Sequence, residues 1–98
     1  MEKDDNVFES FIYEIGGDDG TAYFVNPTYV DAIQGVTTDN RIVYSYEKMV
    51  RYLMEHEYVT EEEAIDYIDY NCIRSLGYMG DHSPIIMYER NVDEYILR

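Results

Sequence analysis

The stretch SYEKMVRYLMEHEYVTEEEAIDYIDYN, residues 45–71, decides most of the expected fold. Thr60 stands where a helix would begin, because its hydroxyl can accept a hydrogen bond from a backbone amide of the first turn. Glu63, three positions later, can return a bond to the Thr60 backbone and complete a capping box. Two helices are therefore predicted, over residues 46–57 and 60–71, and their short connection indicates a helical hairpin or a sharp corner.

Apolar residues recur along both predicted helices at the spacing of a single helical face. Ser45 is the expected cap of the first helix. The residues predicted to face inward are Tyr46, Met49, Val50, Leu53 and Met54 in the first helix, and Ala64, Ile65, Ile68 and Cys72 in the second.

Upstream of these helices, residues 29–46 are predicted to form a β-hairpin. Thr38, Asp39 and Asn40 would supply its turn, because Asp and Asn bond to their own backbone and Asn tolerates the left-handed region. The β-branched pair after the turn is typical of a strand.

The N-terminal third allows two interpretations. Residues 7–15 and 21–25 are rich in aromatic and β-branched side chains and flank the turn-forming GGDDG at 16–20, a pattern that indicates a hairpin. A helix over residues 5–14 is the alternative, because four apolar side chains also have helical spacing. These four are Phe8, Phe11, Ile12 and Ile15. We expect a strand over 21–25 and leave 7–15 open between strand and helix.

The C-terminal part is expected to complete an α+β fold. PIIMYE at 84–89 is predicted to return to the sheet as a late strand, and NVDEYILR at 91–98 to form a short helix. The expected architecture is a small antiparallel sheet of hairpins with two or three packed helices. The length suits a single domain over residues 1–98, with 1–6 expected to be frayed.

Charge is the unusual property of this composition. Seven Lys and Arg residues stand against 21 Asp and Glu, a net charge of −14. Phosphate binding needs clustered Lys and Arg, so neither direct nucleic-acid binding nor binding to an anionic membrane is expected. The expected partners are cations or proteins with basic surfaces. The high net charge could instead serve only to keep the chain in solution.

Cysteine usage and the N-terminus indicate a soluble, cytoplasmic protein. Cys72 is the single cysteine, so no internal disulfide can form, which fits a reducing compartment. The first ten residues lack the basic and apolar regions of a signal peptide. No apolar run is long enough to span a bilayer.

Motifs that could support catalysis or metal binding are incomplete. His56 and His82 are too far apart for the paired-histidine helix of metallohydrolases. GGDDG lacks the alternating ligands and final Glu of a calcium loop. Cys72 is in phase with the inward helical face, which favours a buried thiol over a nucleophile assisted by His82 and Asp81. No catalytic residue, metal or cofactor is predicted. A small metal-dependent enzyme using His56, His82 and nearby carboxylates is the alternative.

Residues 55–71 contain seven carboxylates and no Lys or Arg. At about 100° per residue, Glu62, Asp66 and Asp69 share one helical face. Tyrosines lie beside them, and tyrosine is a large, fairly rigid side chain that is enriched in protein interfaces. The alternative is that the tyrosines border the core and the carboxylates are simply solvated. The predicted partner-binding residues are Glu61, Glu62, Asp66, Tyr67, Asp69 and Tyr70.

Several short motifs between residues 26 and 89 support a resemblance to known proteins. They are NPTY at 26–29, GV at 35–36, YEKMV at 46–50, TEEEAI at 60–65, and YMG with PIIMY at 78–88. Together they resemble a family of small, mostly uncharacterised proteins of phages and mobile elements of low-GC Gram-positive bacteria. Cys72 departs from the family pattern, which usually has threonine at this place. The resemblance implies a phage-borne accessory protein, and small acidic inhibitors of host defence recur among such proteins.

These observations predict a non-catalytic, acidic binding protein. Its carboxylates and tyrosines would mimic a nucleic acid in the groove of a basic host protein that handles nucleic acid, as an inhibitor of the anti-CRISPR or anti-restriction type. That function follows by analogy. A homo-oligomeric phage accessory protein is a further alternative.

Overall fold

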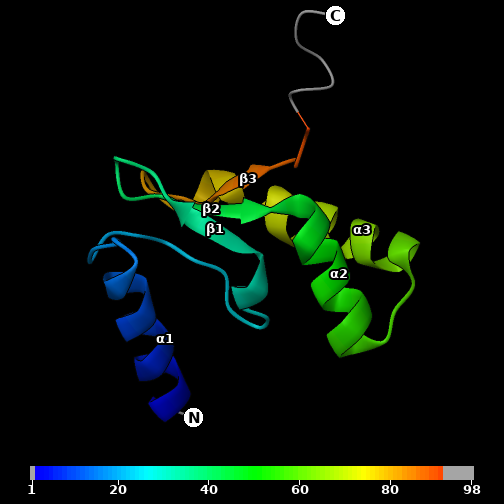
Figure 1. Cartoon of the computed structure of the whole chain (residues 1–98), viewed down its shortest axis with the longest axis horizontal. Coiled ribbons are helices and arrows are strands. Elements are labelled where there is room, and N and C mark those ends of the chain that lie inside the picture. Colours follow the sequence, from blue (N-terminus) through cyan, green and yellow to red (C-terminus); the bar gives the residue numbers. More distant parts are fainter. Residues whose placement is uncertain (1, 92–98) are drawn as a thin grey trace, which may run out of the picture.

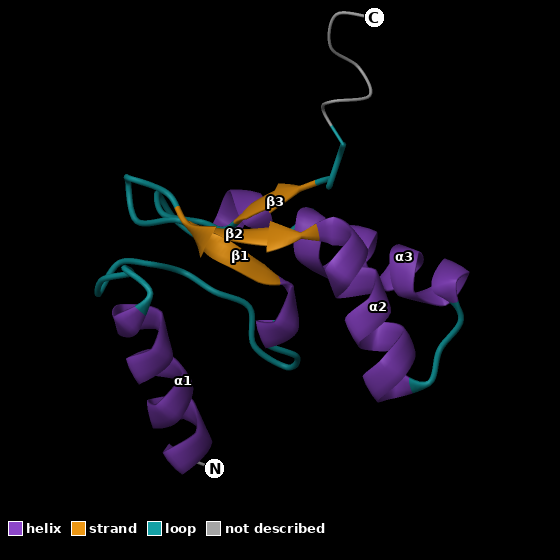
Figure 2. Cartoon of the chain, viewed as in Figure 1, coloured by secondary structure: helices purple, strands orange, loops and turns teal. Residues whose placement is uncertain are grey.

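The computed structural model describes the backbone of residues 2–91 and the side chains from residue 7 onward. It contains a three-stranded sheet, three α-helices and short 3-10 and π segments (Figures 1 and 2). The expected α+β fold is confirmed. The elements in chain order are α1 Glu2–Glu14, η1 Val30–Ala32, β1 Ile33–Val36, β2 Ile42–Ser45, α2 Tyr46–Glu57, α3 Glu61–Ile68, η2 Asp69–Ile73, η3 Leu76–Tyr78 and β3 Ile85–Met87.

The sheet has the order β1-β2-β3 and is mixed. β1 and β2 form the predicted antiparallel hairpin, with a register shift between Ile33 and Gly35. β3 is the predicted late strand and pairs with β2 in parallel, Tyr44 lying opposite Ile86. A parallel neighbour requires a long crossover. Here α2, α3, η2 and η3 provide it, since they connect the end of β2 to the start of β3.

The hairpin turn lies where the sequence predicts it. The backbone amide of Asn40 donates to the Thr37 carbonyl at 3.0 Å, and Asn40 has a φ of 66°. The left-handed region is one that asparagine tolerates better than most residues. The first strand is shorter than expected because the residues before Ile33 form η1.

α1 resolves the open choice over residues 7–15 in favour of a helix. Its end is a Schellman motif: the Gly17 amide donates to the Ile12 carbonyl at 2.9 Å, and the Gly16 amide to the Tyr13 carbonyl at 3.1 Å. Gly16 has a φ of 114°, which favours glycine. A Cβ at Gly17 would lie 2.6 Å from the Ile12 side chain. The glycine pair is therefore the stop signal of a helix and not the turn of a hairpin.

The predicted strand over residues 21–25 is wrong, and so is the hairpin that it would form with 7–15. This segment has no regular secondary structure and runs between α1 and the sheet. The backbone amide of Phe24 donates to the buried Tyr44 hydroxyl at 3.1 Å and not to a strand carbonyl. Its aromatic character reflects burial, because Phe24 packs on Tyr44 and Tyr23 packs on Phe8.

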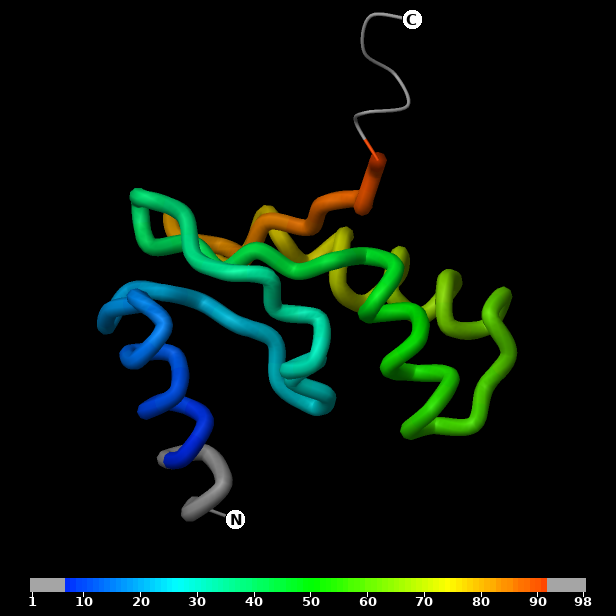
Figure 3. The backbone as a smooth tube through the Cα atoms, in the orientation of Figure 1, coloured from blue at the N-terminus to red at the C-terminus, as the bar shows by residue number. Residues whose placement is uncertain are grey.

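Three loops meet at one end of the sheet, which we call the loop end (Figure 3). It comprises residues 16–21 after α1, residues 37–41 of the hairpin turn, and residues 80–84 before β3. Asp18 joins the first two loops, because its carboxylate accepts a hydrogen bond from the Asn40 side-chain amide at 2.8 Å. Arg41 joins the second to the third through a bond from Nε to the Ser83 carbonyl at 2.9 Å.

Both predicted helix starts in residues 45–71 are confirmed. The Ser45 hydroxyl accepts from the Lys48 amide at 3.2 Å. Thr60 and Glu63 form the complete capping box, with the two bonds at 3.1 Å and 2.9 Å. α2 ends at Tyr58, and the chain turns sharply into α3, as expected.

The core lies between the sheet, α2, α3 and the N-terminal segments. Most predicted inward residues are buried, namely Met49, Val50, Leu53, Ala64, Ile68 and Cys72, whereas Met54 is exposed. Aromatic rings continue the core from Tyr44 through Phe24 and Tyr29 to Tyr52. The helix predicted over residues 91–98 lies, apart from Asn91, outside the described residues.

Candidate partner-binding surface

The six residues predicted to bind a partner are all exposed. Glu61, Glu62, Asp66 and Tyr67 belong to α3, and Asp69 and Tyr70 begin the π segment that continues it. The inner side of the same helix carries the buried residues Ala64 and Ile68. We call these six residues the α3 surface.

The carboxylates of the α3 surface have few partners within the molecule. In the part of the chain that the structure describes, Glu61, Glu62 and Asp66 form no ion pair and no side-chain hydrogen bond. Asp69 accepts one bond, from the Tyr46 hydroxyl at 3.2 Å. Burial, followed by the charge of Asp69, raises the pKa of Tyr46 to about 12. Tyr46 therefore stays neutral near pH 7 and remains a hydrogen-bond donor to Asp69.

Basic side chains also lie beside these carboxylates. Arg74 shares a shallow hollow with Asp66, Asp69 and Tyr70. Its guanidinium lies 5.0 Å from the centroid of the Tyr70 ring, a cation–π contact, and it forms no ion pair with either aspartate. The surface is therefore predominantly but not purely negative.

The α3 surface is divided between neighbouring hollows. Glu61 faces a groove of about 650 Å³ toward α2 and the end of β3, which also contains Arg51 and Arg90. Asp66, Asp69 and Tyr70 line the shallow hollow with Arg74. Tyr67 lines a third hollow. The predicted residues therefore do not converge on one pocket.

The hollow beside Tyr67 has a volume of about 700 Å³. We call it the Tyr67 hollow. It is bounded by the last turn of α2, the start of α3 and the loop that precedes η1. Its lining residues are Asn26, Pro27, Leu53, Glu57, Val59, Glu63 and Tyr67. Of these residues, only Tyr67 was predicted to bind a partner. The spacing of residues in the sequence does not show that the loop carrying Pro27 packs against the helices.

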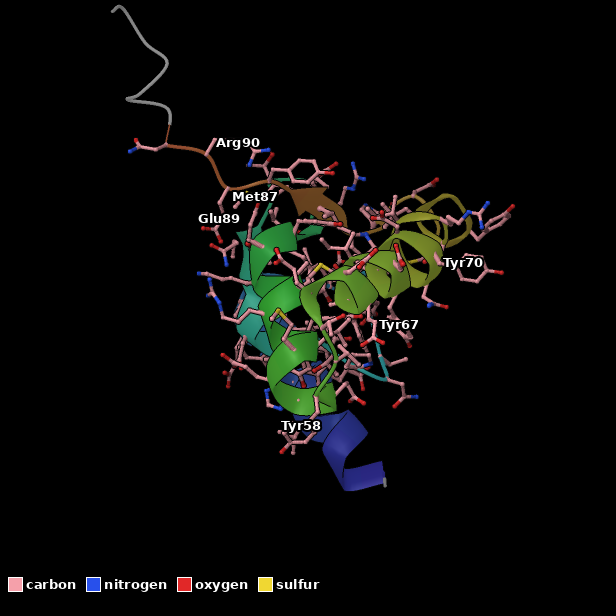
Figure 4. All side chains as sticks on the ribbon, turned by 90° about the vertical axis from the view of Figure 1, so that its right-hand side faces the viewer. Tyr58, Tyr67, Tyr70, Met87, Glu89 and Arg90 are labelled. Carbon is pink, nitrogen blue, oxygen red and sulfur yellow. The ribbon has the colours of Figure 1, made fainter. Side chains whose placement is uncertain are left out.

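Tyr58 is a second feature that the sequence analysis missed. It occupies the corner between α2 and α3 with a φ of 58°, and its side chain is 90% exposed (Figure 4). A helix commonly ends on glycine or asparagine in this conformation, which is unfavourable for a bulky residue. Its position directly after the predicted helix 46–57 is the sequence signal from which an exposed Tyr58 could have been predicted. Tyr58, Tyr67 and Tyr70 are all exposed and come from this one corner and helix.

The residues of the alternative metal or thiol site are not brought together. His56 stacks on Tyr52 in the last turn of α2, with ring centroids 4.1 Å apart. His82 belongs to the loop before β3, and Figure 1 shows that loop on the opposite side of the molecule from the last turn of α2. Among the described residues, no group of three His, Cys, Asp or Glu side chains could hold a metal ion.

Cys72 is buried, as the helical spacing predicts. Its thiol donates to the Tyr29 hydroxyl at 3.5 Å. Burial raises the pKa of the Cys72 thiol, so the reactive thiolate is disfavoured near neutral pH. Burial also raises the pKa of Tyr29, and the bond to Cys72 raises it further. This pair is a satisfied polar contact within the core.

Comparisons with protein-family models, with curated proteins and with solved structures find no match to this chain. None of the helices in the described range is both long and apolar enough to cross a membrane. The function proposed below is therefore supported by the geometry and charge of the surface and by the motif resemblance of residues 26–89 alone.

Proposed function

We propose that this chain is a non-catalytic binding protein whose α3 surface occupies the nucleic-acid groove of a basic host protein. The observation that supports this proposal is the set of exposed carboxylates on α3 without internal partners, flanked by exposed tyrosines. A surface of this kind is complementary to clustered Lys and Arg. The host cytoplasm is the compartment in which such a partner would be met.

Repulsion between the carboxylates lowers the stability of the helix, which supports a role in binding rather than in folding. Glu62 and Asp66 are four residues apart, and Asp66 and Asp69 are three apart. Like charges at these helical spacings destabilise a helix by roughly 0.2–0.5 kcal/mol per pair. A cationic partner would relieve that repulsion.

The carboxylates form a row of negative charge along the helix, as phosphates do along a nucleic-acid strand, at a wider axial spacing. With a rise of about 1.5 Å per residue, positions 62, 66 and 69 are separated by about 6 Å and about 4.5 Å along the helix axis. Phosphates of one strand of B-DNA follow each other at about 3.4 Å along its axis. The tyrosines add apolar contact area at low cost in side-chain entropy.

The resemblance to phage and mobile-element proteins supports an inhibitor of host defence, of the anti-CRISPR or anti-restriction type. This chain would then bind its target in competition with nucleic acid and would not bind nucleic acid directly. The net charge of −14 is consistent with both expectations.

Affinity capture tests this proposal. The full chain is immobilised and exposed to a nuclease-treated lysate of a low-GC Gram-positive bacterium, and captured proteins are identified by mass spectrometry. We expect a basic nucleic-acid-binding protein that elutes as salt rises and that is displaced by its own nucleic acid. A captured partner that its nucleic acid does not displace would contradict the mimicry, and so would capture that is insensitive to salt.

A further inference from the structure

The Tyr67 hollow combines an apolar floor with an aromatic wall. Leu53 is buried at its base, while Val59 and Pro27 are half-buried beside it. The ring of Tyr67 is 43% exposed and lines the same hollow. Its volume of about 700 Å³ lies within the range of about 300–1,000 Å³ typical of ligand sites.

Two carboxylates line this apolar hollow. Glu57 belongs to the last turn of α2 and Glu63 to the first turn of α3. One oxygen of Glu63 accepts the capping bond from the Thr60 amide at 2.9 Å, which leaves its second oxygen available. No Lys or Arg of the described chain lines the hollow. Its charge is therefore negative and uncompensated.

We propose that the Tyr67 hollow binds an arginine side chain that projects from the basic partner. This inference rests on the proposed function and assigns a specific contact to it. The aliphatic stem of the arginine packs on Leu53, Val59 and Pro27, as long basic side chains do on apolar surfaces. Its guanidinium reaches Glu57 and Glu63, the two exposed carboxylates that line the same hollow.

The Tyr67 ring favours binding of arginine over lysine. A guanidinium is planar, can stack on a tyrosine ring, and presents several donors in a fixed fork to carboxylates. An ammonium group is a compact charge that lacks this stacking surface. The molecule already shows the same contact twice, since Arg74 lies 5.0 Å from the Tyr70 centroid and Arg90 lies 5.0 Å from that of Tyr88. Figure 4 shows Tyr67 on α3 and Tyr70 on the π segment η2 that continues it.

A peptide titration tests the site without the partner. The probe is the capped tripeptide acetyl-Gly-Arg-Gly-amide, observed through the methyl resonances of Leu53 and Val59 by NMR. We expect saturable shifts with this peptide, weaker ones with the lysine peptide, and none with the citrulline peptide, which has nearly the same shape but no charge. Equal shifts with the arginine and citrulline peptides, or none with either, would overturn the proposal.

Substitutions then test whether the carboxylates of Glu57 and Glu63 bind the arginine peptide. Glu57→Gln with Glu63→Gln should weaken binding of the arginine peptide roughly tenfold, because two charged acceptors become neutral. Glutamine can still serve in a capping box, so α3 should persist. Glu55→Gln is the matched control, since it lies on the same helix and does not line the hollow. Equal effects of the control and the double variant would contradict the assignment.

The same variants separate this inference from the proposed function. If a basic partner binds through Glu62, Asp66 and Asp69 but tolerates Glu57→Gln and Glu63→Gln, the arginine site is wrong and the function stands. If the arginine peptide binds as expected but no nucleic-acid-binding protein is captured, the site stands and the proposed function fails.

Discussion

At the loop end of the sheet, Asp18 accepts hydrogen bonds from the Gly20 amide, the Thr21 hydroxyl and the Asn40 side chain, at 3.0, 3.1 and 2.8 Å. On α3, Glu62 and Asp66 accept none from any described side chain. The carboxylates of both regions are exposed. Composition alone does not distinguish a carboxylate that holds loops together from one that contributes nothing to the fold.

The negative charge of this chain therefore comes from two kinds of carboxylate, those with hydrogen bonds inside the molecule and those without. At the loop end, the Asp18 carboxylate links two loops that no regular secondary structure joins. On α3, capping accounts for Glu63, and the helix dipole favours acidic residues in the first turn. Neither explains Asp66, which lies beyond that turn and is subject to repulsion from its neighbours. The carboxylates without an internal role are the ones available to a partner.

The largest change in stability should come from the loop end. We expect Asp18→Ala to lower the free energy of unfolding by about 1–2 kcal/mol, because one hydrogen bond between two loops and two bonds within the loop after α1 are lost. Asp66→Ala is the matched control and should change it by less than about 0.5 kcal/mol, or stabilise slightly by removing repulsion. Denaturant melts of both variants measure this. Equal losses would remove the distinction between the two regions.

The start of α3 should give the next largest effect. Thr60→Ala removes the hydroxyl of the capping box and should destabilise the fold by about 1 kcal/mol. Thr60→Ser keeps the acceptor and is expected to recover most of the loss. If denaturant melts of the alanine variant match the wild type, the capping box contributes nothing and α3 is held by its inner face alone.

The smallest change in the free energy of unfolding should come from the hydrogen bond between Thr37 and Asp39, and it should depend on pH. The hydrogen bond from the Thr37 hydroxyl lowers the pKa of the exposed Asp39 carboxyl. A lowered pKa in the folded state adds stability above the unfolded pKa of about 3.9, and that stability is lost as pH falls through the folded pKa. Thr37→Val should therefore be less stable than the wild type at pH 7. The part of the difference that comes from Asp39 should disappear below pH 4, while the part from the lost bond between the Arg41 amide and the Thr37 hydroxyl, at 3.0 Å, should remain.

Carbon-detected NMR titration of Asp39 checks the same bond directly. The pKa of Asp39 should rise toward its ordinary value in Thr37→Val. Thr38→Val is the control, because Thr38 is the exposed neighbour and donates no hydrogen bond to Asp39. If Thr38→Val raises the pKa as much, the hydroxyl of Thr37 is not the cause.

Features set by local chemistry were predictable from the sequence. The caps at Ser45 and Thr60, the turn at Asn40 and the buried face of α3 each depend on a few neighbouring residues. The Gly16–Gly17 pair was equally local, but a hairpin turn and a helix stop use the same residues. The structure decides for the helix, since Phe8, Ile12 and Ile15 gain burial together on one face.

Features set by long-range packing were not predictable. The extended segment through Phe24 resembles a strand in composition, but Tyr44 takes its backbone amide. The parallel pairing of β3 depends on how the helical crossover packs. The Tyr67 hollow combines a loop near residue 26 with two helices of the following half. The exposure of the candidate residues on α3 was predictable, whereas the hollow beside them was not.

The most direct test of the account compares two variants that change net charge equally. In one, Glu62, Asp66 and Asp69 become Lys; in the other, Glu9, Glu14 and Asp81 become Lys, which are exposed residues away from α3. Binding to the captured partner is measured at several salt concentrations, because the Debye length falls from about 10 Å at 0.1 M to about 3 Å at 1 M. We expect the α3 variant to lose binding while it keeps its fold, and the control to retain most of its affinity. Equal losses, or undiminished binding by the α3 variant, would contradict the claim that these carboxylates form a working surface.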